Sequence, residues 1–490
     1  MDTNLILLVI FNIFWITIYG YAIVMAFLLL LDDREASSTF AWILILLFIP
    51  VIGVALYYLT GQNWRRNAKR IKLESHFFDK HLKTVLKSIV GTQNQEILKL
   101  KDFEKKSFDK KMLKLLYNNS NSLLTTKNTV KIFVKGKDKF NSLIEDIKNA
   151  KKFIHLEYYI FRSDVLTKEI KKLLIEKLKE GVEVRIISDT MGSFFLGKKF
   201  RYDLRKAGAK VEEYDNFLYL SKFHTINYRN HRKIAIIDGK IGYTGGMNMG
   251  KEYIDGGKKF SSWRDTHMRI DGEAVKILQA VFSMSWYFTT EEKLFSQKYY
   301  PVFKRMRQKV PLQITTSGPD SEWESIEQLY FSLINIASKE VLIQTPYFIP
   351  TASLATALKT AALSGVTVKL MVAGAPDKKL PFNAAFTYFN DLMKAGVQVY
   401  HYNKGFMHSK TIVVDGKICS IGSANMDVRS LKLNYELNVL IYEDKLSKQL
   451  KKQFNIDLKE CKEFTMEEYH NFSLIKRLKN SLSRLMAPLL

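Results

Sequence analysis

The sequence contains little cysteine and none of the common nucleotide-binding signatures. Its two cysteines, Cys419 and Cys461, form no CxxC pair and lie in no Cys/His cluster. This argues against a disulfide framework and against a structural zinc site. A P-loop and a GxGxxG fingerprint are also missing. The residues therefore predict neither a metal site nor a nucleotide site.

Acidic residues are scarce relative to basic ones. Among 490 residues, 75 Lys and Arg stand against 49 Asp and Glu, which gives a formal net charge of +26. Such an excess predicts a polyanionic partner, either nucleic acid or an anionic membrane surface. The length exceeds that of one ordinary core, so we expect two or more domains.

Charge is absent from residues 5–31, a run long enough to cross a bilayer. A second apolar stretch, residues 40–59, contains Pro50 and Gly53, which transmembrane helices tolerate. A buried core helix is the alternative for each stretch. A cleaved signal peptide fits poorly, because no basic region precedes the first run. We expect residues 1–62 to form a two-helix transmembrane hairpin.

The distribution of basic residues predicts the orientation of that hairpin. Its short loop holds one basic residue, Arg34, whereas the end of the second stretch is followed by a basic cluster: Arg65, Arg66, Lys69, Arg70 and Lys72. Because basic residues stay on the cytoplasmic side, the chain is predicted to be a multi-pass cell-membrane protein with the remainder in the cytoplasm. Residues 63–125 are expected to form a basic juxtamembrane linker that contacts anionic lipid.

Beyond residue 125 the sequence predicts strand–helix alternation that occurs twice. In the first copy we expect strands at 129–134, 153–161 and 182–189, with helices at 140–150 and 165–180. Strands at 341–350 and 366–373 correspond to the second and third of these, and AGVQVYHY (395–402) matches AGAKVEEY (207–214). The pattern predicts two α/β half-domains with mixed or parallel sheets, at 126–305 and 306–465.

Each half contains the same polar signature at the head of an apolar strand. NHRKIAIIDGK (230–240) holds His231 and Lys233, and MHSKTIVVDGK (407–417) holds His408 and Lys410. Residues i and i+2 of a strand face the same side, so each His–Lys pair is expected to face one space. Lysine can hold a phosphoryl oxygen, and histidine titrates near neutrality. One histidine could therefore attack phosphorus while the other protonates the leaving oxygen.

Further residues are expected to support these pairs. Asn248 and Asn425 each follow their histidine by seventeen positions and are expected to donate hydrogen bonds to the phosphoryl oxygens. Two carboxylates, Asp265 and Glu436, are candidates to orient the imidazole rings. The Asp-Gly pairs that begin at residues 238 and 415 predict tight hairpin turns, and Asp238 and Asp415 are interpreted mainly as anchors of those turns.

The duplicated HxKxxxxD, with GGxN and GSxN downstream, resembles the motif of the phospholipase D superfamily. Within that superfamily the chain resembles the bacterial cardiolipin synthases, on the twin amino-terminal spans and on HLEYYIFRSD, WRDTHMRIDG, TPYFIP and GSANMDVRS. The segment GGMNMGKEY differs from the common pattern of the family at Met249 and Lys251. The resemblance implies two tandem phospholipase-D-like half-domains and these catalytic-motif residues: His231, Lys233, Asp238, His408, Lys410 and Asp415.

The resemblance also implies an activity. It implies a cytoplasmic-face phosphatidyltransferase that joins two phosphatidylglycerols into cardiolipin and glycerol through a phosphatidyl-histidine, without a metal or other cofactor. The family's usual assignment makes His231 the nucleophile, although the two motifs are nearly symmetric in sequence. A hydrolytic phospholipase D would use the same residues. A nuclease is disfavoured by the two spans, so no nucleic-acid partner is expected, and a non-enzymatic lipid scaffold would not need the histidines.

The carboxyl terminus, residues 466–490, predicts a basic amphipathic helix. Its apolar face is expected to consist of Phe472, Ile475, Leu478, Leu482 and Leu485. Such a helix could lie on a membrane or pack against the core of the protein, and the sequence favours neither alternative.

Overall fold

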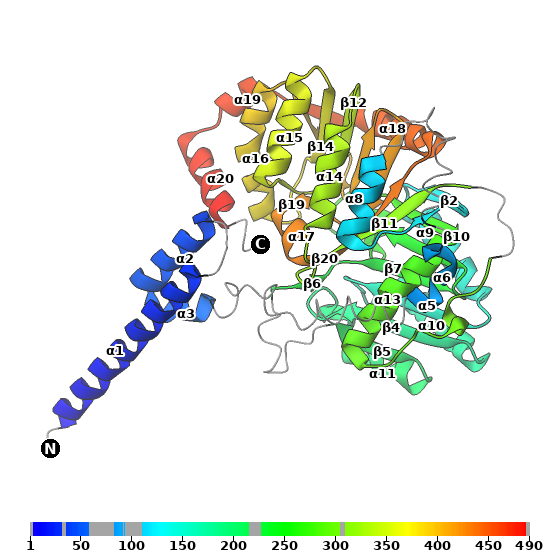
Figure 1. Ribbon diagram of the computed structural model, residues 1–490, viewed down its shortest axis with the longest axis horizontal. Coiled ribbons are helices and arrows are strands. Elements are labelled where there is room, and N and C mark those ends of the chain that lie inside the picture. Colours follow the sequence, from blue (N-terminus) through cyan, green and yellow to red (C-terminus); the bar gives the residue numbers. More distant parts are fainter. Residues whose placement is uncertain are drawn as a thin grey trace. The chain divides into compact units, whose positions relative to one another are not determined.

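The computed structural model describes residues 3–31, 36–57, 83–91, 93, 110–214, 227–303 and 309–486. Contacts divide the chain into a small unit, which contains residues 1–67, and a large unit of residues 68–215 and 228–490. Figure 1 shows the helices and strands of both units, and each unit is described by itself. The basic cluster between Arg65 and Lys72 lies outside the described residues.

The small unit contains α1 (Thr3–Leu30), α2 (Ala36–Phe48) and α3 (Pro50–Leu56). Helix α1 is long and apolar enough to cross a membrane. The second predicted span differs from the expectation, because the helix breaks at Ile49 and restarts with Pro50 in its first turn. Proline has no N–H to continue the ladder of α2. The pieces pack around Ala22, Leu29, Leu46 and Tyr57.

The large unit is built from two sheets whose main strands follow the same order and orientation. The first sheet runs β2 (Asn128–Phe133), β10 (His267–Gly272), β8 (Ile241–Gly245), β7 (Lys233–Ile237), β3 (Phe153–Tyr158), β4 (Glu183–Asp189) and β5 (Lys210–Tyr214). The second runs β11 (Leu312–Ser317), β20 (Asn434–Ile441), β18 (Ile418–Gly422), β17 (Thr411–Val414), β12 (Glu340–Gln344), β14 (Thr367–Ala373) and β15 (Gln398–Tyr402). In each sheet the last three strands are parallel and the others antiparallel. Two tandem mixed α/β half-domains are therefore present, as predicted.

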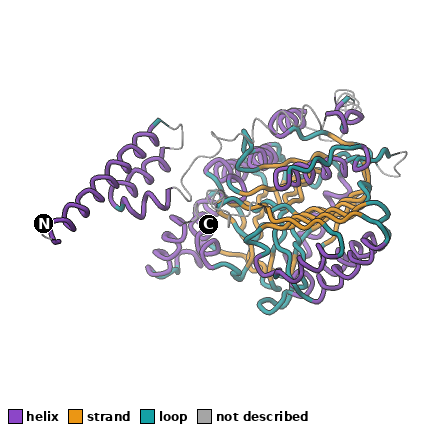
Figure 2. Tube along the Cα trace, turned by 90° about the horizontal axis from the view of Figure 1, so that it is seen from below, coloured by secondary structure: helices purple, strands orange, loops and turns teal. Residues whose placement is uncertain are grey.

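Helices cover both faces of the sheets, and Figure 2 shows the strands surrounded by helices. The helices that cover the outer face of the first sheet are α9 (Gly136–Lys148), α10 (Val165–Lys179) and α11 (Lys198–Lys206). Their counterparts on the second sheet are α14 (Ser325–Asn335), α15 (Ala352–Leu363) and α16 (Lys379–Lys394). A central core that includes α13 (Ala274–Thr290) and α18 (Asp444–Leu458) contacts both sheets.

Strand β7 shows why this arrangement suits its sequence. Ile234 and Ile236 face the central core, whereas Ala235 and Ile237 face the outer core of the first half. Alternate residues of a strand point to opposite faces, so a strand that is covered on both sides needs a continuous apolar run. The run after each His-x-Lys is such a strand.

Two expected boundaries differ in the structure. Residues 110–125, expected to be linker, include α8 (Lys110–Ser120) and β1 (Leu124–Thr125), and β1 pairs with the edge strand β11. Met112, Leu113 and Leu116 of α8 are buried, and this helix pattern explains its packing on the second half. The strand predicted at 341–350 ends at Gln344 and restarts as β13 (Phe348–Ile349), because the chain turns toward β19 (Met426–Asp427).

The remaining described elements are short, except for α20. They are α5 (Lys83–Val85), α6 (Lys87–Val90), η4 (Phe194–Leu196), β6 (Arg229–Asn230), α12 (Glu252–Asp255), β9 (Trp263–Arg264), η6 (Gln297–Tyr299), β16 (Phe406–Met407), α17 (Val428–Lys432), β21 (Cys461–Phe464), α19 (Met466–His470) and α20 (Leu474–Met486). Two of them, β6 and β16, join one half to the other: β6 pairs with β20, and β16 pairs with β9.

Candidate active site

The short parallel pairs between the halves bring each histidine to a carboxylate of the other half. The N–H of His231, directly after β6, donates to the carbonyl of Tyr435, the residue before Glu436, at 2.9 Å. The N–H of His408, directly after β16, donates in the same way to Arg264, the residue before Asp265, at 2.7 Å. The two histidines therefore reach one site through equivalent backbone contacts.

The ring contacts follow this crossed pattern. His231 Nδ1 lies 2.8 Å from Glu436 Oε1, and His408 Nδ1 lies 2.6 Å from Asp265 Oδ2. Both carboxylates are fully buried. Since an ionised carboxylate only accepts hydrogen bonds, Nδ1 carries the proton in each ring. This leaves each Nε2 as the nitrogen with a free lone pair.

Burial sets the protonation of these pairs. It lowers the pKa of both histidines to about 4, an effect that the carboxylates only partly offset. Burial acts to raise the pKa of Asp265 and Glu436, but the facing histidines and nearby lysines hold both below their ordinary values. At neutral pH the site therefore contains two neutral imidazoles against two ionised carboxylates.

The small residues that follow the return strands pack against the two carboxylates. A Cβ on Gly246 would lie 2.0 Å from Asp265 Oδ1, so the glycine leaves room for that carboxylate. At the equivalent position of the second half, the Ser423 hydroxyl donates to Glu436. Glu436 also accepts from Asn434 Nδ2 at 3.2 Å. The small residues thus form the surroundings of the two carboxylates.

The two motif lysines are buried, with exposed fractions of 0% for Lys233 and 1% for Lys410. Each Nζ donates to the carbonyl of the histidine two residues earlier, at 2.5 Å. Desolvation lowers the pKa of Lys233 to about 7 and that of Lys410 to about 8, although Glu436 and Asp265 favour their charged forms. An anion bound at the histidines would stabilise both ammonium groups.

Asp238 and Asp415 bind backbone at the hairpin turns. Asp238 accepts from the N–H groups of residues 151–153 at 2.7–3.0 Å, and Asp415 accepts from those of residues 338–340 at 2.8–3.0 Å. Both have a φ of 54°, and the glycines that follow them have φ values of 64° and 62°. Two successive residues with positive φ are the conformation of a type I′ turn. The two carboxylates connect each hairpin to the start of the neighbouring strand.

Both histidines line a cavity of about 570 Å³ between the halves. Asn248 and Asn425 also line it, whereas Lys233 and Lys410 are not among its described lining residues. Asn248 accepts from the Ile160 N–H and donates to the Tyr253 hydroxyl at 2.7 Å. Asn425 donates to Asp427 at 3.1 Å, and its Oδ1 has no protein partner among the described residues.

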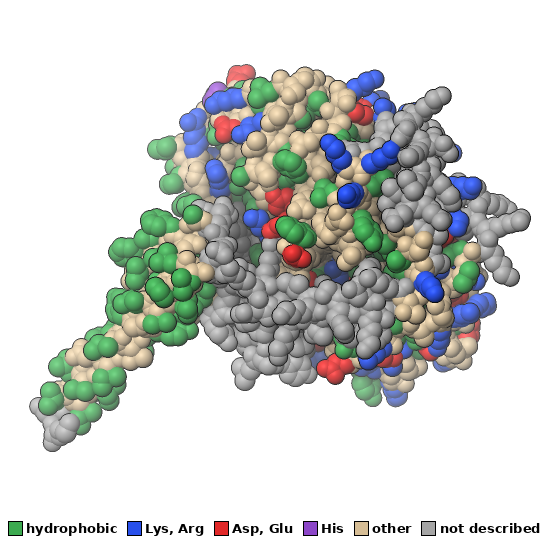
Figure 3. All heavy atoms as spheres, viewed as in Figure 1, with side chains coloured by type: hydrophobic (Ala, Val, Ile, Leu, Met, Phe, Trp, Pro, Cys, Tyr) green, Lys and Arg blue, Asp and Glu red, His purple; other side chains and the backbone are tan. Residues whose placement is uncertain are grey.

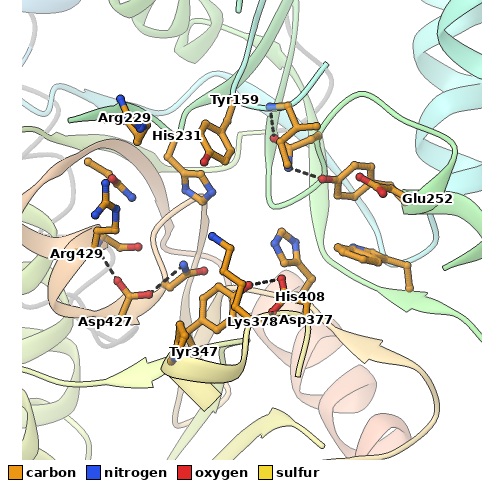
Figure 4. Close-up of a pocket in the computed structure, with 18 of the residues that line it drawn as sticks. Tyr159, Arg229, His231, Glu252, Tyr347, Asp377, Lys378, His408, Asp427 and Arg429 are labelled. Atoms are coloured by element: carbon orange, nitrogen blue, oxygen red, sulfur yellow. Dashed lines mark hydrogen bonds between the residues drawn. The ribbon is translucent and has the colours of Figure 1, made fainter. Parts of the chain in front are cut away.

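The cavity wall also contains residues that the sequence reasoning did not single out. Tyr159 contacts His231 with ring centroids 4.9 Å apart, and Tyr347 of the second half also lines the cavity. Arg229 and Arg429 come from opposite halves, and Figure 4 shows them on the His231 side of the cavity. The repeat gave no signal for these residues. Phe161 of HLEYYIF is equivalent to Phe348 of TPYFIP, which aligns Tyr347 with Ile160 and not with Tyr159. The two arginines also occupy different places in the two repeats.

Electrostatically, the cavity suits an anionic head group. Desolvation and the neighbouring charge of Arg229 lower the pKa of the Arg429 guanidinium. Further cations on the wall are Arg162, Lys258, Lys259 and Lys378. Aromatic and apolar side chains lie between them, including Trp263, Phe260 and Pro381. Among the described residues, no group of three or more His, Cys, Asp or Glu is placed to hold a metal ion.

Comparison with known proteins places these features in a family. The model for the family described as cardiolipin synthase, PLD-like domain, matches residues 143–286 and 330–458, and the phospholipase D-nuclease N-terminal model matches residues 20–62. The chain is 43% identical over 471 residues to the major cardiolipin synthase of Bacillus subtilis (strain 168), covering 94% of this chain and 95% of that one.

Two further matches bear on the family and on the fold. A cardiolipin synthase of Listeria monocytogenes serotype 4a (strain HCC23) is 41% identical over 496 residues, covering 99% of this chain and 98% of that one. The crystal structure of the phosphatidylserine synthase of Haemophilus influenzae Rd KW20 aligns with a TM-score of 0.58 at 14% identity. It covers 78% of this chain and 100% of that one, and at this identity it shows a shared fold alone.

Proposed function

The chain belongs to the cardiolipin synthase family of phosphatidyltransferases, and we propose that it transfers a phosphatidyl group from one phosphatidylglycerol to another, releasing glycerol. The observation that supports this most directly is the pair of histidines, each oriented by a carboxylate of the other half, on one cationic cavity. Membership of this family indicates that the substrate is a phospholipid in a membrane.

In the first step of the proposed reaction, His231 Nε2 attacks the phosphorus of the donor lipid. The bond between phosphorus and the glycerol oxygen breaks, and His408 donates a proton to that oxygen. The product is a phosphatidyl-histidine and free glycerol. Because His408 is neutral in the free protein, its proton must be stabilised by the bound phosphate anion and by Asp265.

In the second step, His408 accepts the proton of a head-group hydroxyl of the second phosphatidylglycerol. The hydroxyl oxygen forms the new bond to phosphorus, and the bond to His231 breaks. Lys233, Lys410, Asn248 and Asn425 stabilise the charge on the phosphoryl oxygens in both steps. We assign phosphates of the bound lipids to the cationic wall at Arg229 and Arg429, since the product carries two phosphates.

For localisation, we propose a multi-pass membrane protein with its catalytic halves on the cytoplasmic side. The apolar α1, the shorter apolar α2 and the basic residues that follow the second stretch support this topology. We propose an anionic membrane surface, and not nucleic acid, as the partner of the excess positive charge. Cysteine-accessibility labelling of residue 34 and residue 66 in intact cells tests the topology: only residue 34 should react.

Product analysis tests the activity. Purified protein is incubated with phosphatidylglycerol alone, and cardiolipin, phosphatidic acid and glycerol are measured by mass spectrometry. The proposal predicts one glycerol per cardiolipin. Phosphatidic acid as the main product would replace the synthase with a hydrolase. A His408→Gln variant serves as the control and should form neither product.

A further inference from the structure

Helix α20 (Leu474–Met486) carries large apolar side chains that the protein does not cover. With about 100° between successive residues, these side chains form one stripe about 100° wide along the helix. Their exposed fractions are 82% for Leu474, 80% for Ile475, 59% for Leu478, 53% for Leu482 and 76% for Leu485. A stripe of this size that is exposed to water indicates an interaction surface.

The opposite face of α20 packs on α16 through polar and basic side chains. Asn480 and Ser483 are each only 3% exposed. Lys476 Nζ lies 3.5 Å from the centroid of the Phe472 ring, and the Arg484 guanidinium lies 5.0 Å from that of Tyr388. The helix predicted in residues 466–490 is two helices, α19 and α20, and Phe472, which was expected on the apolar face, packs on the core beside Phe386 and Phe464. The other four predicted apolar residues are exposed, so α20 itself contacts the core through its polar face.

The charges beside the apolar stripe identify its partner. Arg477 and Lys479 lie on its two sides by helical position, and Figure 3 shows hydrophobic and basic side chains together over α20. Basic residues that flank an apolar face are typical of helices that lie in the interface of an anionic bilayer. A second copy of α20 would cover the leucines but would place like charges against one another.

We propose that α20 lies in the head-group layer of an anionic bilayer, with Leu474, Ile475, Leu478, Leu482 and Leu485 among the acyl chains and Arg477 and Lys479 at the lipid phosphates. The segment that forms this site is different from the apolar helix α1. The contact of α20 with the bilayer holds the second half-domain on the membrane surface that contains the lipid substrate.

Contacts connect α20 to the cavity through one layer of side chains. Tyr388, whose ring lies under the Arg484 guanidinium, packs against the cluster of Ile349 and Ala384, and Val428 packs against the same cluster. Ile349 and Val428 line the cavity that contains the histidines. Docking of α20 therefore brings the bilayer close to the cavity wall. The consequence for lipid transfer rests on the proposed function, whereas the docking itself does not.

Fluorescence of the full-length protein tests the docking. Leu482→Cys is labelled with a polarity-sensitive fluorophore and reconstituted into phosphatidylglycerol or phosphatidylcholine vesicles. Leu363→Cys is the matched control, since this leucine at the end of α15 is 74% exposed. The unsubstituted protein, with Cys419 buried and Cys461 half-buried, is the labelling blank.

The proposal predicts a blue shift and quenching by lipid-borne quenchers at position 482, stronger in phosphatidylglycerol than in phosphatidylcholine, and neither change at position 363. A probe at position 482 that stays in water in phosphatidylglycerol vesicles would overturn the proposal. So would a shift that depends on the protein-to-lipid ratio, because that result would identify a second copy as the partner.

An activity comparison tests the consequence for catalysis. The double variant Leu478→Gln/Leu482→Gln should make cardiolipin on the order of tenfold more slowly from vesicle phosphatidylglycerol. It should match the unsubstituted protein on short-chain phosphatidylglycerol dissolved as monomers, and Leu363→Gln should match it on both. Equal rates on both substrates, or equal losses on both, contradict the role of α20. If the unsubstituted protein makes no cardiolipin from either, the proposed function fails and the fluorescence result still decides the docking.

Discussion

At the scale of single residues, the site depends on four side chains in two crossed pairs. His231 contacts Glu436 and His408 contacts Asp265, so each pair takes one residue from each half. The pairs differ in one respect. Glu436 also accepts hydrogen bonds from the side chains of Ser423 and Asn434, whereas Asp265 also accepts one from the N–H of Thr266. Both rings have Nδ1 fixed and Nε2 available.

Removing the charge of one carboxylate should impair the histidine that it orients. We predict that Glu436→Gln lowers kcat by about a thousandfold or more, because an amide no longer stabilises the imidazolium or fixes its tautomer. Asp265→Asn should have an effect of similar size. Steady-state kinetics give the loss, and circular dichroism controls for folding. A variant that is folded and retains more than a tenth of the activity would contradict the role assigned to Glu436.

The two motif lysines predict that phosphatidylglycerol binds less well at alkaline pH. Burial lowers the pKa of Lys233 to about 7 and that of Lys410 to about 8. Both side chains therefore lose their charge in the free protein as the pH rises from 7 to 9. We expect the KM for phosphatidylglycerol to rise several-fold over this range. The kcat should change less, since bound phosphate raises both pKa values. A KM that is constant to pH 9 would contradict this reading.

The histidines predict an acid limit of stability. Their pKa of about 4 lies below the unfolded value of 6.5, so the unfolded chain binds protons first as the pH falls. For each histidine, the free energy of unfolding should fall by on the order of 2 kcal/mol when the pH is lowered from 7 to 5. Because His155 and His401 have lowered pKa values as well, the test compares thermal unfolding of the protein with that of His231→Gln/His408→Gln. The double variant should lose less stability on acidification.

At the scale of elements, the β7–β8 and β17–β18 hairpins carry the motif and are held by the turn aspartates. The sequence predicted both hairpins because Asp-Gly after a β-branched run specifies a type I′ turn. It did not predict the break at Ile49–Pro50 or the end of β12 at Gln344, since both depend on where the chain must turn. It also treated residues 110–125 as linker, because the many lysines nearby obscured the buried face of α8.

Loss of a turn aspartate should act on stability more than on chemistry. We predict that Asp415→Ala lowers the free energy of unfolding by about 2–4 kcal/mol, because three backbone N–H groups lose their acceptor and alanine disfavours a positive φ. Asp391→Ala, on the exposed side of α16, is the control and should change it little. Thermal unfolding in detergent measures both. Unchanged stability with lost activity would instead make Asp415 part of the chemistry.

At the scale of the whole molecule, one cavity forms because two similar sheets face a common core. The sequence predicted the duplication and the residues of the motif. The crossed pairing of histidine and carboxylate could not be read from it, because the pairing depends on β6 meeting β20 and β16 meeting β9, contacts between strands about 140–200 residues apart. Arg229 and Arg429 reach the same wall only through this contact between the halves.

In the proposed mechanism both halves build one site, in which the phosphatidyl group is bound covalently to His231 between donor and acceptor. The direct test uses phosphatidylglycerol with a labelled phosphate, a rapid quench at neutral pH and peptide mapping. We predict transient label on the peptide that contains His231, formed as glycerol is released and lost as cardiolipin appears. Label on the His408 peptide would reverse the two roles. Cardiolipin formed at full rate without label on either histidine would contradict the covalent mechanism.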